Sequence, residues 1–197
     1  MNLPNKLTVS RFFITILFTI LILSNYAYSN LLALIVFIVG MTTDFIDGRI
    51  ARAQNLKTDF GALMDPLADK VMVCAAFVCF VARGWLGPYG AYFVILIISR
   101  EFLITGLRIL AGARGQILSA DRLGKHKTAW QMITIIMVLI RNVTDEVFTS
   151  RDPVWLDGAL QILTWSVYLT MAVTIALTLY SGFAYMVKNK QLWAENN

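Results

Sequence analysis

Residues 44–52 read Asp44-Phe45-Ile46-Asp47-Gly48-Arg49-Ile50-Ala51-Arg52 and close an apolar segment that begins near Leu31. Asp44, Asp47 and Ala51 recur at a spacing that places them on one face of a helix. Ionisable groups inside apolar helices cost several kcal/mol unless they are paired, bound to metal or in contact with water. The stretch therefore predicts a functional site at one end of an apolar helix.

A second group of carboxylates follows on the next apolar segment, where Gly61, Asp65 and Asp69 recur at intervals of four. Because the connection is short, the two helices are expected to be antiparallel neighbours with four carboxylates at one depth. Such a cluster needs protons, basic partners or divalent metal, and all-oxygen ligation selects hard cations such as Mg²⁺, Mn²⁺ or Ca²⁺. Asp65-Pro66 also fits a helix cap followed by proline, which would explain Asp65 alone.

The composition of the 197-residue chain is that of a membrane protein. It is 58% hydrophobic and 15% charged, with a mean hydropathy of +0.67, whereas soluble domains lie near ~45–50% and ~25%. These values argue against a cytosolic enzyme, a disordered tail, a collagen-like fibre and a disulfide scaffold. The predicted fold is an all-α membrane protein, a six-transmembrane-helix bundle forming a single integral membrane domain over residues 1–197, because lipid leaves no solvent for unpaired backbone groups.

Six apolar segments are expected at about 9–25, 31–53, 67–82, 89–111, 129–140 and 159–187. The net charge of +5 gathers at the two termini and in alternate connections, including a basic loop around His126, whereas the stretch 141–157 is net acidic and is read as an outer loop. The positive-inside rule then places both termini and the carboxylates on the cytoplasmic face of the cell membrane, with no nucleic-acid partner. The first segment is read as a retained helix, and Cys74 and Cys79 as unpaired.

Written as spacing, residues 44–69 read D-x2-D-G-x2-A-R-x8-G-x3-D-x3-D. This pattern is similar, at all eight positions, to the signature of the CDP-alcohol phosphotransferases, and the six segments fit that family along the whole chain. The stretches 2–11, 99–108 and 124–128 resemble the phosphatidylglycerophosphate synthase branch. The resemblance implies transfer of a phosphatidyl group from CDP-diacylglycerol to sn-glycerol 3-phosphate with release of CMP, and a homodimer embedded in membrane lipid.

The resemblance also implies roles for single positions. It assigns two divalent ions, Mg²⁺ or Mn²⁺, to Asp44, Asp47, Asp65 and Asp69, with Asp69 also the base. It assigns the CDP moiety to Thr8, Gly48, Arg52, Thr58 and Gly61. The chemistry of the residues agrees, because paired metals neutralise a pyrophosphate and a carboxylate can take the proton of an alcohol.

The phosphate of the acceptor requires basic side chains to bind it. We expect Arg108 and Lys125 to be these residues, with Arg11 and Arg100 as second choices. Glu101 lies seven residues before Arg108 on the same helical face and is expected to orient it. The remaining basic residues are expected to set topology and attract anionic lipid, and a long basic side chain can also snorkel to the headgroups.

Two alternatives stay open from the sequence. One is another CDP-alcohol transferase of the inositol-phosphate, serine or cardiolipin type. The other is a divalent-cation transporter, which would place its carboxylates near the bilayer midplane rather than at one end of the helices.

Overall fold

The computed structural model describes the backbone of residues 3–53, 59–113, 122–149 and 153–190. Within these ranges, the side chains of residues 3–9, 44–53, 59–69, 113, 122, 123 and 125 lie outside the description. The described ranges form six α-helices and contain no strand: α1 (Leu3–Leu23), α2 (Ser29–Ala53), α3 (Asp59–Ala82), α4 (Gly90–Ala113), α5 (Arg122–Phe148) and α6 (Leu156–Lys188). The expected all-α class is confirmed.

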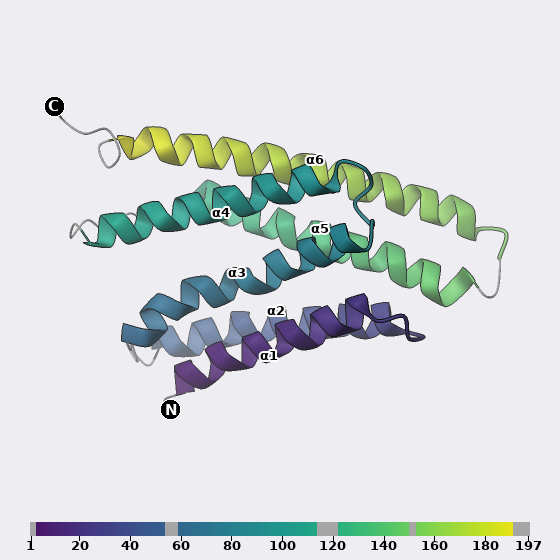
Figure 1. Cartoon of the computed structure of the whole chain (residues 1–197), viewed down its shortest axis with the longest axis horizontal. Helices are drawn as coiled ribbons and strands as arrows, with labels where there is room; N and C mark the ends of the chain where they lie inside the picture. The colour runs from purple at the N-terminus through teal and green to yellow at the C-terminus, as the bar shows by residue number, and fades with distance from the viewer. Residues whose placement is uncertain (1–2, 54–58, 114–121, 150–152, 191–197) are drawn as a thin grey trace.

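The six helices alternate in direction along the long axis of the molecule (Figure 1). Helix α1 packs against α2 and α3, α5 packs against α2 and α6, and α4 joins α3 to α6. The N-terminal ends of α1, α3 and α5 and the C-terminal ends of α2, α4 and α6 therefore lie at one end of the bundle. We call this end, which carries residues 44–53 and 59–69, the site end.

Aromatic side chains fill the centre of the bundle. The rings of Phe18 and Phe37, from α1 and α2, have centroids 5.8 Å apart, and those of Phe77 and Phe93, from α3 and α4, have centroids 5.3 Å apart. These four side chains are at most 2% exposed. Edge-to-face and tilted aromatic pairs of this kind are favourable contacts, and they join α1 to α2 and α3 to α4.

Helix α3 ends where a glycine can take a left-handed conformation. Gly84 has φ +70°, and the amide of Trp85 donates to the carbonyl of Phe80 while the amide of Gly84 donates to that of Val81. This is a Schellman motif, and its usual apolar contact is present because the rings of Phe80 and Trp85 lie 5.5 Å apart. The third predicted segment therefore ends at residue 82 as expected.

The outer surface of the bundle is apolar on every helix. Exposed side chains include Phe13 of α1, Leu32 of α2, Val78 of α3, Ile95 of α4, Ile133 of α5 and Phe183 of α6. Soluble monomers rarely expose contiguous apolar surface on this scale. In the described part of the chain, one helix, Leu156–Lys188, is long and apolar enough by itself to cross a bilayer.

The helices extend well beyond the expected apolar segments at four ends, and α1 begins at Leu3 rather than at about residue 9. Helix α5 spans 122–148 rather than 129–140, so the basic loop around His126 and much of the acidic outer loop are helical. The C-terminal extension of α5 is stabilised by Glu146. Its carboxylate accepts hydrogen bonds from the backbone amides of Asn30 at 3.2 Å and Leu31 at 3.4 Å, at the start of α2. Helix α3 begins at Asp59, which places Asp65 and Pro66 inside the helix rather than at its cap.

Candidate active site

The backbone places the carboxylate motif at the site end of the bundle. Asp44 and Asp47 lie in the C-terminal half of α2, and Asp65 and Asp69 lie in the N-terminal half of α3. Their spacing puts each pair on one face of its helix. The side chains of the four aspartates are outside the described residues, as are those of Thr8, Arg52 and Lys125. Gly48 and Gly61 are described by their helical backbone alone, and Thr58 lies in an undescribed segment. Their expected roles therefore remain predictions.

Beside this motif, the described residues form a buried charge cluster around Glu101 of α4. Its carboxylate pairs with Lys70 of α3 at 3.4 Å, with Arg100 at 3.6 Å and with Lys127 of α5. The amide Nε2 of Gln131 in α5 donates to the same carboxylate at 3.4 Å. We call these five residues the Glu101 cluster, and it joins the middle of α3 and of α4 to the first turns of α5.

Burial makes this cluster different from a surface ion pair. The side chain of Lys127 is 3% exposed, that of Glu101 9% and that of Arg100 11%. Charges removed from water in this way are stable only when their partners stay in place. Lys70, which is half-buried, also donates to the hydroxyl of Thr105, and that hydroxyl in turn donates to the carbonyl of Glu101 at 2.7 Å.

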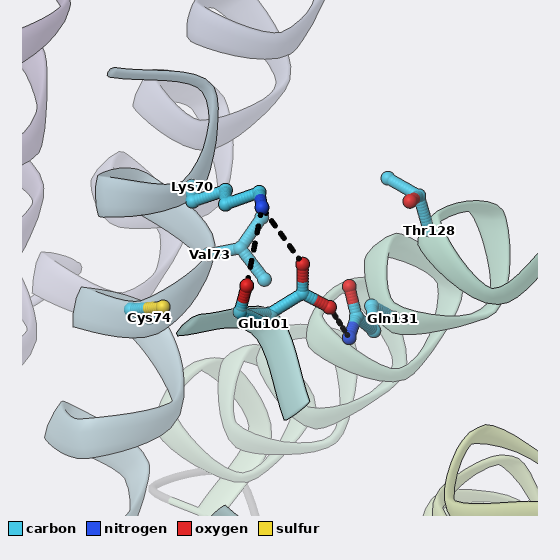
Figure 2. A pocket seen from close by; sticks show the side chains of 6 residues that line it. All are labelled: Lys70, Val73, Cys74, Glu101, Thr128 and Gln131. Carbon is cyan, nitrogen blue, oxygen red and sulfur yellow. Dashed lines mark hydrogen bonds and ion pairs between the residues drawn. The ribbon is translucent and has the colours of Figure 1, made fainter. Parts of the chain in front are cut away.

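A cavity of about 180 Å³ adjoins the cluster and is lined by Lys70, Val73, Cys74, Glu101, Thr128 and Gln131. In Figure 2 the ammonium group of Lys70 and the amide of Gln131 approach Glu101 from opposite sides, with Thr128 across the opening. The lining therefore mixes one carboxylate and one cation with neutral hydrogen-bonding groups, and α3 adds the less polar Val73 and Cys74 beside Lys70.

Helix α6 supports the two arginines of α4. Arg100 donates from Nη2 to the hydroxyl of Ser181 at 3.2 Å. Arg108 is exposed, and its guanidinium lies over the ring of the buried Tyr185, 5.5 Å from the centroid, while its Nε donates to the Tyr185 hydroxyl at 3.4 Å. A guanidinium has five N–H donors, so those of Arg108 that are not directed at Tyr185 can contact a ligand.

Three expectations about the basic residues are corrected. Within the described part of the chain, Glu101 contacts the cations of its own cluster, and Arg108 instead contacts Tyr185, so Glu101 does not orient Arg108. Lys127 is buried and ion-paired rather than a solvated loop residue or a topology signal. His126 is exposed, as expected, but on a helix.

Lys70, Gln131 and Tyr185 were missed by sequence reasoning. Lys70 had a usable signal, because a lysine at the start of an apolar segment is an ionisable group at membrane depth. Gln131 and Tyr185 had none, since neutral polar residues at helical spacing occur in any helix interface. Arg11, the third expected acceptor cation, is half-buried in α1.

Nothing in the described side chains groups three or more His, Cys, Asp or Glu residues closely enough to hold a metal ion. The four motif aspartates are the carboxylates that the sequence places near one another. Their backbone positions on α2 and α3 are compatible with holding a metal ion between these helices. A set of oxygen donors alone fits hard divalent cations rather than zinc or copper.

The chain matches the CDP-alcohol phosphatidyltransferase family over residues 1–180. It belongs to this family. It is similar to the CDP-diacylglycerol–glycerol-3-phosphate 3-phosphatidyltransferase of Bacillus subtilis, with 35% identity over 100% of this chain and 99% of that protein. Proteins of the same name from Cereibacter sphaeroides and Rickettsia typhi are 30% and 29% identical, over 95% and 93% of this chain and 95% and 94% of their own lengths.

Proposed function

We propose that this chain transfers the phosphatidyl group from CDP-diacylglycerol to sn-glycerol 3-phosphate, giving phosphatidylglycerophosphate and CMP. The observation that carries the proposal is the complete family signature over residues 44–69. The relative from Bacillus subtilis, which is named CDP-diacylglycerol–glycerol-3-phosphate 3-phosphatidyltransferase, aligns with the whole length of this chain. The activity is a step of phospholipid biosynthesis carried out by an integral membrane enzyme.

The motif residues have distinct roles in this proposal. Asp44, Asp47, Asp65 and Asp69 hold two divalent ions, Mg²⁺ or Mn²⁺. When bound, these ions neutralise the pyrophosphate and polarise its phosphorus. The CDP moiety is bound by Thr8, Gly48, Arg52, Thr58 and Gly61, of which the two glycines leave room for a ligand to approach the backbone.

Asp69 accepts the proton of the acceptor hydroxyl, and the hydroxyl oxygen attacks phosphorus in line with the departing CMP. Bond formation to the acceptor oxygen and cleavage of the bond to CMP then occur in one displacement. A positioned base of this kind contributes about 10²–10⁴ in rate.

The acceptor is recognised through its phosphate by Arg108, Lys125 and Arg11. The contact of Arg108 with Tyr185 supports this assignment, because the exposed arginine is kept at the end of α4 and at the site end of the bundle. A phosphomonoester carries a charge of about −1.5 to −2 at pH 7, so two or three cations are the matching number.

We also propose that all six helices span the cell membrane, with both termini and the active site in the cytoplasm. The alternating helix directions and the apolar exterior support this arrangement, as does the excess of Lys and Arg in the segments at the site end. In this position the acyl chains of CDP-diacylglycerol stay in the bilayer while its nucleotide reaches the carboxylates at the surface. The enzyme is expected to work as a homodimer.

An acceptor panel tests the function. Purified protein in lipid or detergent is assayed for CMP release from CDP-diacylglycerol with Mg²⁺ or Mn²⁺, in the presence of glycerol 3-phosphate, serine, inositol or inositol phosphate. Release that depends on glycerol 3-phosphate is expected. Equal release with another acceptor would refute the acceptor assignment, and metal-dependent ion flux into vesicles without CMP release would favour a transporter.

A further inference from the structure

The Glu101 cluster connects two helices that otherwise have little contact. Helices α4 and α5 are not among the closely packed helix pairs of the described residues, whereas each packs against α3 and α6. Among the described hydrogen bonds and ion pairs, the carboxylate of Glu101 in α4 is the direct bridge to Lys127 and Gln131 of α5. It adds a side-chain link near the start of α5 to the packing of both helices on α3 and α6.

The contacts between Glu101 and its basic partners depend on the negative charge of its carboxylate. Three cations, from Lys70, Arg100 and Lys127, surround one carboxylate. If the carboxylate is neutralised, three basic side chains lose their shared partner at positions where water is largely excluded, which disfavours their present arrangement. Lys127 has the least freedom, because its side chain is only 3% exposed.

These contacts lie next to residues that the proposed function uses. Lys127 follows Lys125 by two positions on α5, and Arg108 lies two turns after Glu101 on α4. Both proposed acceptor cations are therefore carried by the two helices that the Glu101 carboxylate joins. Lys70 directly follows Asp69 on α3, and its contacts with Glu101 and Thr105 draw its ammonium group toward α4, as Figure 2 shows for Lys70 and Glu101.

We propose that Glu101 is a positioning residue for acceptor binding, acting through Lys127 and the start of α5. The inference rests on the proposed function, since it needs an acceptor phosphate to be held between α4 and α5. Its carboxylate fixes the separation of the two helices and so the distance between Arg108 and Lys125. Glu101 itself does not touch the substrate in this account, because its negative charge would repel a phosphate.

The test uses Glu101→Gln and Glu101→Asp in the full-length protein, with KM for glycerol 3-phosphate, KM for CDP-diacylglycerol, kcat and the thermal unfolding midpoint measured for each. Glu101→Gln is expected to raise the acceptor KM about tenfold and to change the KM for CDP-diacylglycerol less than about twofold. Glu101→Asp keeps the charge on a shorter side chain, so it is expected to fold and to give an intermediate acceptor KM.

Glu146→Gln is the matched control. Glu146 is also a carboxylate that joins two helices, α5 and α2, but at the end of the bundle away from the site. It is expected to lower the unfolding midpoint without changing either KM. In a Lys127→Met background, Glu101→Asp is expected to have no further effect on the acceptor KM, because the residue through which it acts is gone.

The outcomes separate this inference from the proposed function. If the wild type releases no CMP in response to glycerol 3-phosphate, both are wrong. If the wild type is active but Glu101→Asp lowers the midpoint like Glu146→Gln and leaves the acceptor KM unchanged, the role of Glu101 is purely structural and only the inference fails. A larger rise in the KM for CDP-diacylglycerol than for the acceptor would also refute it.

Discussion

Gly182 lies where α6 meets Arg100 of α4, and its replacement by alanine tests how firmly that arginine is held. A Cβ atom at this position would lie 3.1 Å from Cγ and 3.6 Å from Nε of Arg100. The far end of the arginine is attached to the Ser181 hydroxyl at 3.2 Å and to the Glu101 carboxylate at 3.6 Å. Cγ therefore cannot move away without lengthening one of these contacts.

Two opposing effects decide the sign of the change in stability. Alanine in a helix interior is favoured over glycine by about 0.5–1 kcal/mol. Overpacking a closed site costs about 1–3 kcal/mol. Because Arg100 is fixed at both ends, we expect the steric cost to be larger, so that Gly182→Ala lowers the free energy of unfolding by about 1 kcal/mol. For a chain of this size the unfolding midpoint then falls by about 2–4 °C.

The measurement is thermal unfolding in detergent followed by intrinsic tryptophan fluorescence. Gly106→Ala is the matched control, since Gly106 lies inside α4 with nothing within 4 Å of a new Cβ, and its midpoint is expected to rise. In an Arg100→Ala background the clash disappears, so Gly182→Ala is expected to become neutral or stabilising. The same decrease with and without the arginine would refute the reasoning.

Four further predictions concern the site and the ends of the bundle. Asp69→Asn is expected to leave the protein inserted and folded but without turnover, and CMP release above about a tenth of wild type would contradict its role as base. Chelation of divalent cations is expected to stop CMP release and added Mg²⁺ or Mn²⁺ to restore it, whereas full activity in chelator would exclude the metal role of the aspartates. Arg108→Ala is expected to raise the KM for glycerol 3-phosphate more than that for CDP-diacylglycerol, and an unchanged acceptor KM would remove Arg108 from acceptor binding. Glu146→Ala is expected to destabilise the protein by about 1 kcal/mol in thermal unfolding through loss of its contacts at the start of α2, and an unchanged midpoint would show that these contacts add no net stability.

The predicted helix boundaries were most accurate where a local signal ends the helix. Gly84 and the Phe80–Trp85 contact end α3 at the predicted residue, because the Schellman motif depends on neighbours in sequence. The ends of α5 could not be found in this way. Its first turns carry Lys127 and its last turns carry Glu146, and both are accommodated by partners on other helices. A hydropathy pattern registers those charges only as the end of an apolar segment.

The same distinction applies to the candidate site. The carboxylate motif can be read from sequence because its residues are three, four or seven positions apart on single helices. The Glu101 cluster cannot, since it depends on α3, α4 and α5 meeting at one point. From the sequence, Glu101 had a plausible partner on its own helix in Arg108. The structure instead pairs it with cations from three helices, and Arg108 with Tyr185.

The distribution of charge at the site end is what the proposed reaction needs. Helices α2 and α3 carry the motif aspartates, whereas α4 and α5 carry Arg100, Arg108 and Lys127. The donor substrate brings a pyrophosphate that requires divalent cations, and the acceptor brings a phosphate that requires basic side chains. The two cations proposed for the acceptor on α4 and α5, Arg108 and Lys125, therefore come from other helices than the aspartates proposed for the metal ions.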